Sequence, residues 1–328
     1  MIAPEACAQY DREEDASIPL KYFYIKRQKN LLRSFLSRFH FSLGVGYGST
    51  AFRHGLEGFD IVQEPDSLPK LVTTNTVTPV YSNWVNKVEP SSWSVSPGAF
   101  QASSDTTELG FRARGFNIPL KATLHMEFDR YRVGGGYSIE YMRTGSFQPL
   151  YYGSDISGFT PAEPSTIMKK YFASIGGSVY RYKDYLLVLS ADFGGYSLGK
   201  KYDKASLSKG IFINLGATVE REISEHFRLF VRPSYDLKNY KINFPESGNS
   251  ITHHFNSFYL NFGGTYRIPG LPRCFHKKCR AQVDHAHGNK VYRSRVHPFY
   301  KKQNPHHGEN YRELIKYKGR NKRKLSPY

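Results

Sequence analysis

The chain has 328 residues, a formal net charge of +18 and a mean hydropathy of −0.54. No stretch reaches the roughly 18 consecutive apolar residues that a transmembrane helix needs. The sequence therefore excludes a helical membrane protein but allows a membrane β-barrel, in which only alternate strand residues face lipid.

The first residues resemble the end of an export signal. Ala6-Cys7-Ala8 has the small-x-small pattern of a signal-peptidase site, but the apolar core of a signal peptide does not precede it. Residues 1–8 are therefore expected to be either a signal-peptide remnant or a chance match. Residues 9–38 are expected to be a periplasmic segment. Basic residues mixed with leucines and Phe35 predict a short amphipathic helix there, with a plain linker as the alternative.

One pattern recurs eight times along the middle of the chain. Apolar and polar side chains alternate over about ten residues, which places them on opposite faces of a β-strand. In the last copy, one face carries Phe258, Leu260 and Phe262, and the opposite face carries Asn261 and Gly263. The eight expected strands are residues 39–48, 116–128, 131–142, 171–180, 185–196, 211–220, 227–237 and 258–266.

The polar face of these strands is expected to line the inside of a barrel. It is rich in Gly, Ser, Thr and Asn, which fit the narrow interior of an eight-stranded barrel, and aromatic residues lie near both ends of the apolar face. A soluble barrel such as a lipocalin, with its apolar face inward, is the alternative. The ionisable residues of the polar face carry both signs and are expected to form an internal network: Lys121, His125, Glu127, Arg132, Glu140, Asp192, Glu220, Arg228, Arg232 and Asp236.

The connections predict an all-β, eight-stranded antiparallel up-and-down transmembrane barrel over residues 39–268. Short turns alternate with long loops, and in such barrels the short turns face the periplasm. We therefore expect a location in the cell outer membrane, contact with its lipid, and both termini in the periplasm. The longest loop, 49–115, holds Trp84 and Trp93 and is expected to be an ordinary surface loop with an extra hairpin, such as 70–80 with 105–115; a ligand site is the alternative.

A family resemblance rests on the second and third strands. Phe116-Asn117-Ile118-Pro119-Leu120, followed by Phe128 and the Gly-rich run Tyr131-Arg132-Val133-Gly134-Gly135-Gly136-Tyr137, resembles the central hairpin of the Bacteroidetes outer-membrane β-barrel family. That family includes PorT-like proteins of the type IX secretion and gliding apparatus, and it is similar in architecture to OmpA-OmpX-like eight-stranded barrels. The resemblance covers roughly residues 39–268 and implies location more than activity. The long first loop and the basic tail depart from the family pattern.

The last segment, residues 269–328, is expected to be a basic, largely irregular periplasmic tail. From Gly270 to Tyr328 there are 16 Lys and Arg against 3 Asp and Glu, a net +13. Cys274 and Cys279 lie near His285 and His287. In an oxidising periplasm this spacing favours a disulfide, with free or intermolecular thiols and a tetrahedral metal site as alternatives. No metal and no cofactor are assigned from the sequence.

The expected function is non-catalytic: a barrel that anchors a tail, which docks onto a periplasmic protein, envelope machinery or peptidoglycan. A barrel enzyme acting on lipid or peptide is one alternative, with His125 beside Glu127 as its candidate base. A soluble nucleic-acid-binding protein is another, although no nucleic-acid partner is expected. The tail residues expected to bind the partner are Lys277, Lys278, Arg280, Arg293, Arg295, Lys301, Lys302, Arg320, Lys322, Arg323 and Lys324.

Overall fold

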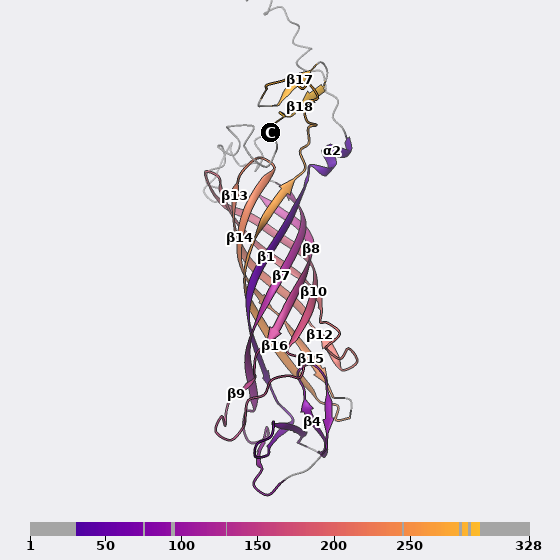
Figure 1. Ribbon diagram of the computed structural model, residues 1–328, viewed down its shortest axis with the longest axis vertical. Helices are drawn as coiled ribbons and strands as arrows, with labels where there is room; N and C mark the ends of the chain where they lie inside the picture. Colours follow the sequence, from indigo (N-terminus) through magenta and orange to yellow (C-terminus); the bar gives the residue numbers. More distant parts are fainter. Residues whose placement is uncertain are drawn as a thin grey trace, which may run out of the picture.

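The computed structural model describes residues 31–74, 76–92, 96–128, 130–244, 246–281, 284–287 and 290–295. The regular structure in these ranges is almost entirely β, with one short helix, α2, at Leu31–Leu36. The long strands form a ring (Figure 1). They are β1 (Phe39–Gly55), β7 (Gly110–Phe128), β8 (Tyr131–Thr144), β10 (Ser165–Tyr182), β11 (Tyr185–Ser197), β13 (Ile211–Glu222), β14 (Phe227–Leu237) and β16 (Ser250–Arg267).

The ring closes because β1 pairs antiparallel with both β7 and β16. His40 of β1 lies opposite His125 on one side and Arg267 on the other. All eight predicted segments lie within these strands, so the ring of eight agrees with the sequence. The sheet as a whole is larger than predicted and has 11 strands. The additional strands are β9 (Gln148–Pro149) on β7, β15 (Asn239–Asn243) on β16, and β12 (Leu207–Lys209) on β15.

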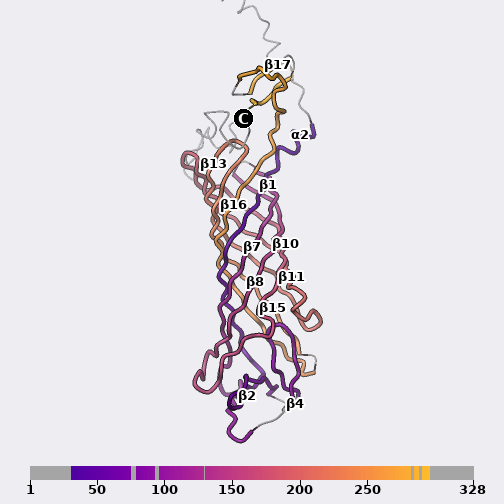
Figure 2. Tube along the Cα trace, in the orientation of Figure 1, coloured from indigo at the N-terminus to yellow at the C-terminus, as the bar shows by residue number. Residues whose placement is uncertain are grey.

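The first long loop folds into a separate sheet at one end of the barrel, which we call the cap. Its strand order is β5-β4-β3-β2-β6, and Figure 2 shows it below the barrel, opposite the tail. The expected hairpin of 70–80 with 105–115 is wrong, because β3 pairs with β2 and β4, while residues 110–115 continue β7 and pair with β1. The cap strands are β2 (Phe59–Gln63), β3 (Lys70–Thr73), β4 (Thr76–Asn83), β5 (Glu89–Ser91) and β6 (Phe100–Ser103).

The opposite end, which we call the tail end, carries both the entry and the exit of the barrel chain. Helix α2 leads into β1, and the Arg267 side chain at the end of β16 donates a hydrogen bond to the Ser37 carbonyl at 2.6 Å. Beyond β16 the described part of the tail includes a short hairpin of β17 (His285–His287) and β18 (Lys290–Tyr292) (Figure 1). The sequence predicted a largely irregular tail, and this hairpin is an ordered exception.

The two faces of the ring have opposite polarity. Outward side chains on β1 are Phe41, Leu43, Val45 and Tyr47, all exposed, whereas inward ones in the same part of the ring are polar or glycine. On β7 the outward apolar residues extend from Ile118 to Phe128, a span of eleven residues, close to the ~9–11 that a tilted strand needs to cross a bilayer. This excludes the lipocalin-like alternative, since a soluble barrel buries its apolar face.

Aromatic residues mark the two edges of the apolar band. Those toward the tail end are Phe41, Phe128, Tyr131, Tyr182, Tyr185 and Tyr266, and those toward the cap are Tyr47, Tyr141, Tyr171, Tyr235 and Phe258. Beyond the cap-side edge the outward positions become charged, as at Arg53 and Arg114. A band of this kind, with interfacial aromatics on both sides, is the arrangement of a barrel that spans a membrane. No helix among the described residues is long and apolar enough to cross a membrane.

Candidate functional site

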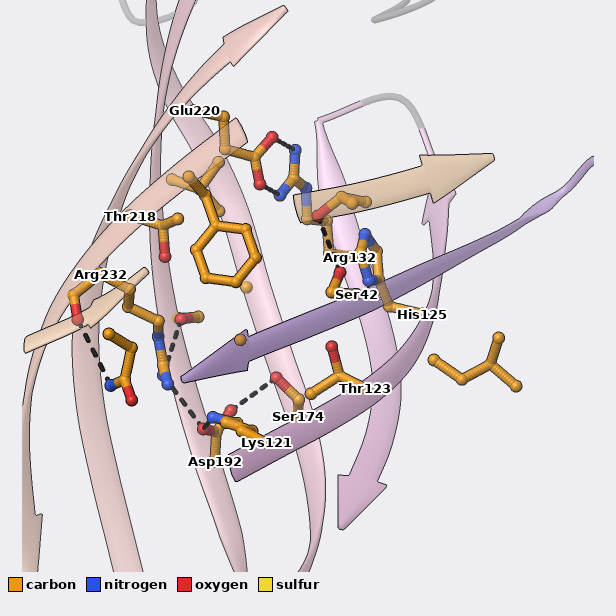
Figure 3. Close-up of a pocket in the computed structure, with 18 of the residues that line it drawn as sticks. Ser42, Lys121, Thr123, His125, Arg132, Ser174, Asp192, Thr218, Glu220 and Arg232 are labelled. Atoms are coloured by element: carbon orange, nitrogen blue, oxygen red, sulfur yellow. Dashed lines mark hydrogen bonds and ion pairs between the residues drawn. The ribbon is translucent and has the colours of Figure 1, made fainter. Parts of the chain in front are cut away.

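The barrel interior holds three groups of ion-paired side chains, stacked along its axis. The group nearest the tail end joins strands that are distant in the sequence. Arg132 of β8 forms a two-pronged ion pair with Glu220 of β13 (Figure 3). Arg132 also contacts Glu127 of β7 at 2.9 Å. Arg228 of β14 contacts Glu127 at 2.7 Å and Glu220 at 3.4 Å. Each buried charge therefore has at least two partners of opposite sign.

The middle group surrounds Asp192 of β11. Lys121 of β7 donates to one carboxylate oxygen at 2.6 Å, Arg232 of β14 contacts the same oxygen at 3.0 Å, and Ser174 of β10 donates to the other at 2.7 Å (Figure 3). A cavity of about 90 Å³ borders this group. It has room for several water molecules, since one water needs roughly 10–15 Å³ of such a cavity.

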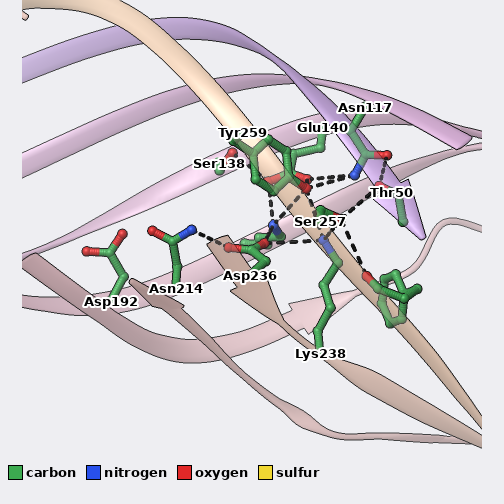
Figure 4. Close-up of polar contacts among 12 residues, drawn as sticks. Thr50, Asn117, Ser138, Glu140, Asp192, Asn214, Asp236, Lys238, Ser257 and Tyr259 are labelled. Atoms are coloured by element: carbon green, nitrogen blue, oxygen red, sulfur yellow. Dashed lines mark hydrogen bonds and ion pairs between the residues drawn. The ribbon is translucent and has the colours of Figure 1, made fainter. Parts of the chain in front are cut away.

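The third group lies nearest the cap and is centred on Asp236. Its carboxylate accepts from Lys170 and Asn214, and from Lys238 at 3.2 Å (Figure 4). Lys170 also contacts Glu140 at 2.6 Å. The hydroxyl of Tyr259 donates to Glu140 at 2.7 Å and accepts from Lys238 at 3.0 Å, which links the two carboxylates.

These groups fill the lumen together with aromatic rings. The Lys121 ammonium lies 4.5 Å from the centre of the Phe172 ring, and the Lys170 ammonium lies 5.2 Å from that of Phe212. Small inward residues make room: a Cβ on Gly216 would lie 2.7 Å from the Arg232 Nε atom. The interior is thus closed by side chains, as expected for a ring of eight strands.

All ten residues that the sequence assigned to the internal network lie in these three groups or next to them. Among the described residues, the missed members include Lys170, Lys238, Arg181, Glu222 and His40. Lys170 and Lys238 lie just beyond the ends of the expected strands, so continuing the alternation by one residue would have found them. Arg181 forms a buried ion pair with Glu222, but it faces inward only because a bulge at 178–180 shifts the alternation. A strict two-residue period could not have predicted that.

His125 is placed in the tail-end group. Its ring stacks on His40 at 5.2 Å between centroids, and its Nε2 atom lies 3.6 Å from Glu127. The nearby Ser42 hydroxyl bonds to Thr265 at 2.8 Å rather than to a histidine nitrogen. Because a serine nucleophile needs a base within hydrogen-bond reach, Ser42 and His125 are not arranged as a nucleophile and its base.

Beyond the apolar band, on the side of the cap, the same ring encloses an aromatic core that attaches the cap. Trp84 is fully buried and donates through its indole Nε1 to His54 of β1 at 3.1 Å. Tyr240 donates to the Val85 carbonyl at 2.8 Å and stacks on His253. The sequence expectation of a surface loop around Trp84 is therefore wrong, whereas Trp93 lies outside the described residues.

The two histidines of this core are held neutral. Burial lowers the pKa of His54 well below its usual range, and the neighbouring His253 adds to that shift. Burial also lowers the pKa of His253 to about 3. Their ring centroids are 4.6 Å apart, so a charge on either imidazole would be neither hydrated nor paired.

In the tail, Cys274 and Cys279 are free thiols in this structure. Lys277, Lys278 and Arg280 are exposed beside them, whereas Arg293 and Arg295 are half-buried. The remaining expected partner-binding residues lie outside the described residues: Lys301, Lys302, Arg320, Lys322, Arg323 and Lys324.

Comparisons with known proteins add little to this geometry. No protein-family model matches the chain, and no curated protein matches it. Among solved structures, the outer membrane protease OmpT from Escherichia coli has a TM-score of 0.31 at 11% identity, covering 70% of this chain and 96% of its own. A Pseudomonas aeruginosa FadL homologue has 0.22 at 9% identity, covering 72% and 92%. The translocator domain of the autotransporter NalP from Neisseria meningitidis has 0.22 at 9% identity, covering 80% and 97%. Likenesses this weak carry no argument about activity.

Proposed function

We propose that this protein is an outer-membrane β-barrel with a sealed interior that anchors a basic periplasmic tail. The observation that carries the proposal is the reversal of polarity across the ring wall: apolar residues with aromatic edges outside, and ion-paired residues inside. The apolar band fixes the depth of the barrel in lipid, and the network across the lumen makes it a rigid support. The barrel conducts no solute, because charged side chains and rings occupy its cross-section.

The tail supplies the binding function in this proposal. Its net charge of +13 over residues 270–328 suits an anionic partner, either peptidoglycan carboxylates or an acidic face of a periplasmic protein. The exposed Lys277, Lys278 and Arg280 lie on the part of the tail that leaves the barrel first. A role beside PorT-like proteins in type IX secretion or gliding rests on the resemblance of the β7–β8 hairpin alone.

Membrane fractionation with gel analysis before and after boiling tests the barrel half of the proposal. We expect the protein in the outer membrane, with a faster-migrating band before boiling, because folded membrane barrels resist detergent. Planar-bilayer recording should show no stable open channel. Protein in the soluble fraction, or a persistent large conductance, would contradict the proposal.

Sedimentation with purified peptidoglycan tests the tail half. We expect the full-length protein in detergent to cosediment, and 300 mM NaCl to reduce binding strongly, because the Debye length then falls to about 6 Å. The triple variant K277Q/K278Q/R280Q should bind more weakly. The control R112Q/R114Q/R143Q removes three exposed charges beyond the opposite edge of the band and should bind as the wild type does. Equal loss in both variants would show non-specific charge attraction, and no binding by the wild type would direct the search to a protein partner.

A further inference from the structure

The described part of the tail brings two thiols and two imidazoles to one point. The Sγ atom of Cys274 lies 3.3 Å from the Nε2 atom of His287, and the Sγ atom of Cys279 lies 3.2 Å from the Nε2 atom of His285. All four atoms lie within 4.8 Å of one another. In a tetrahedral zinc site, with Zn–S near 2.3 Å and Zn–N near 2.0 Å, neighbouring sulfur and nitrogen ligands are separated by roughly 3.6 Å. The four atoms are therefore close enough together to bind one tetrahedral ion.

The backbone presents these ligands from two separate pieces of chain. Cys274 and Cys279 bracket a turn, in which the Cys279 amide donates to the His276 carbonyl at 3.1 Å. His285 and His287 are alternate residues of β17. The Cys274 amide donates to the Arg293 carbonyl at 3.0 Å, which ties the turn to the segment after β18. Two cysteines and two histidines are one of the donor sets found in structural zinc sites.

Size explains why this segment needs a central ligand. From Cys274 to Arg295 the apolar residues are few, and Cys274 and Ser294 are the buried residues among those described there. A unit this small cannot be held by hydrophobic burial, so it needs a disulfide or a metal. A disulfide would account for the two sulfurs, but it would leave unexplained why each sulfur faces an imidazole nitrogen.

We propose that Cys274, Cys279, His285 and His287 bind one zinc ion, which organises the first part of the basic tail. Two thiolates offset the 2+ charge, and two neutral imidazoles complete the coordination. This soft, four-coordinate donor set suits zinc. Binding releases the thiol protons to solvent and involves no redox step. The metal holds Lys277 and Lys278 on the turn between the two cysteine ligands, at the point where the tail leaves the barrel. The site depends on the tail alone, so it is independent of the partner proposed above.

Cobalt substitution of the full-length protein tests the proposal. The protein is kept in detergent under reducing, metal-free conditions and titrated with Co²⁺. We expect saturation at one equivalent, with the intense near-ultraviolet bands of thiolate coordination and the visible bands of tetrahedral cobalt. Zinc should displace the cobalt and bleach both sets of bands.

Matched variants locate the site. C279S and H287Q should each weaken metal binding at least about tenfold and reduce the thiolate bands. H276Q is the control, because His276 lies in the same turn and its nitrogen atoms are not among the four. Heat-modifiability on a gel shows that the barrel of each variant is folded. A spectrum without tetrahedral thiolate bands, or one that H287Q and H276Q change equally, would overturn the proposal.

Thiol trapping tests the redox alternative in cells. In protein alkylated at the moment of lysis, Cys274 and Cys279 should both be alkylated, and protein purified in parallel without alkylation should carry one zinc per chain. A Cys274–Cys279 disulfide in that material, with no zinc, would overturn the zinc site as the cellular state. Neither result bears on whether the barrel lies in the outer membrane.

Discussion

Two regions of the barrel use the same strands in opposite ways. In the apolar band, the inward residues of β16 are Asn261, Tyr259 and Ser257, and the outward ones are apolar. A few residues further along, inward Phe255 is fully buried, while outward His254 is exposed. The pairing of β1 with β16 continues through both regions without a register shift. The reversal is therefore a change of side chains on an uninterrupted ladder.

The difference shows that the surroundings decide which face carries the apolar residues. Where lipid surrounds the ring, apolar side chains face outward and the closed interior must satisfy its polar groups by pairing them. Where water surrounds the ring, apolar side chains gain by turning inward, and they form the core that holds the cap. Lys238 lies at the boundary between the two regions. Its ammonium bonds to Asp236 on one side and lies 5.0 Å from the centre of the Phe255 ring on the other.

The largest effect is expected from removing one charge of the interior. Asp236→Ala leaves Lys170 and Lys238 without their shared carboxylate, and breaking a buried ion pair in this way costs about 3–5 kcal/mol. Urea unfolding in lipid vesicles, followed by the heat-modifiable band, measures the change. A loss below about 1 kcal/mol would mean that water hydrates this region, and the contrast with the aromatic core would then be weaker than described.

A charge on the outer face tests where the lipid ends. Leu43→Arg places a charge in the middle of the apolar band and should cost about 2–4 kcal/mol. Ala51→Arg, on the same face of the same strand but beyond Tyr47, should cost about 0–1 kcal/mol. The same unfolding assay compares the two variants. Equal costs would place the membrane boundary elsewhere on β1.

Acid should destabilise the cap, because its core holds two neutral histidines. His54 and His253 are neutral in the folded state, whereas an unfolded histidine binds a proton below about pH 6.5. The unfolded cap therefore binds more protons, and its stability falls as the pH drops from about 6.5 toward 3. The slope is about 1.4 kcal/mol per pH unit for each histidine.

Fluorescence of Trp84 in a Trp93→Phe background follows this transition. His253→Gln should reduce the slope, and His254→Gln, at the exposed neighbouring position, should not. A pH-independent signal between pH 7 and pH 4 would mean that the cap does not depend on neutral histidines.

The smallest effect is expected at an exposed ion pair. Arg53 and Glu108 lie 3.7 Å apart, with their side chains 67% and 68% exposed. Glu108→Ala should change the unfolding free energy by less than about 1 kcal/mol, because solvent screens the pair. A larger loss of unfolding free energy would show that solvent screens this pair less than its exposure indicates.

Alternation along the chain predicted all eight ring strands, since an amphipathic strand that crosses lipid needs strict alternation over about ten residues. The same pattern did not predict the cap, the residues at strand ends or the residue after a bulge. The cap could not be derived because its contacts, such as that of Trp84 with His54, join residues 30 positions apart that no local pattern pairs. Lys170 was missed at a strand end, and Arg181 faces inward only through a bulge.

The sequence by itself determined the strand positions, the two faces and the uneven charge, because each follows from residue order over a short distance. Tertiary structure alone decided which residues share a carboxylate, how the first long loop attaches, and that Cys274, Cys279, His285 and His287 converge. The ion-paired residues are distant along the chain and meet because the ring closes, whereas the four tail residues lie at most 13 positions apart and meet because the tail forms a turn and a hairpin.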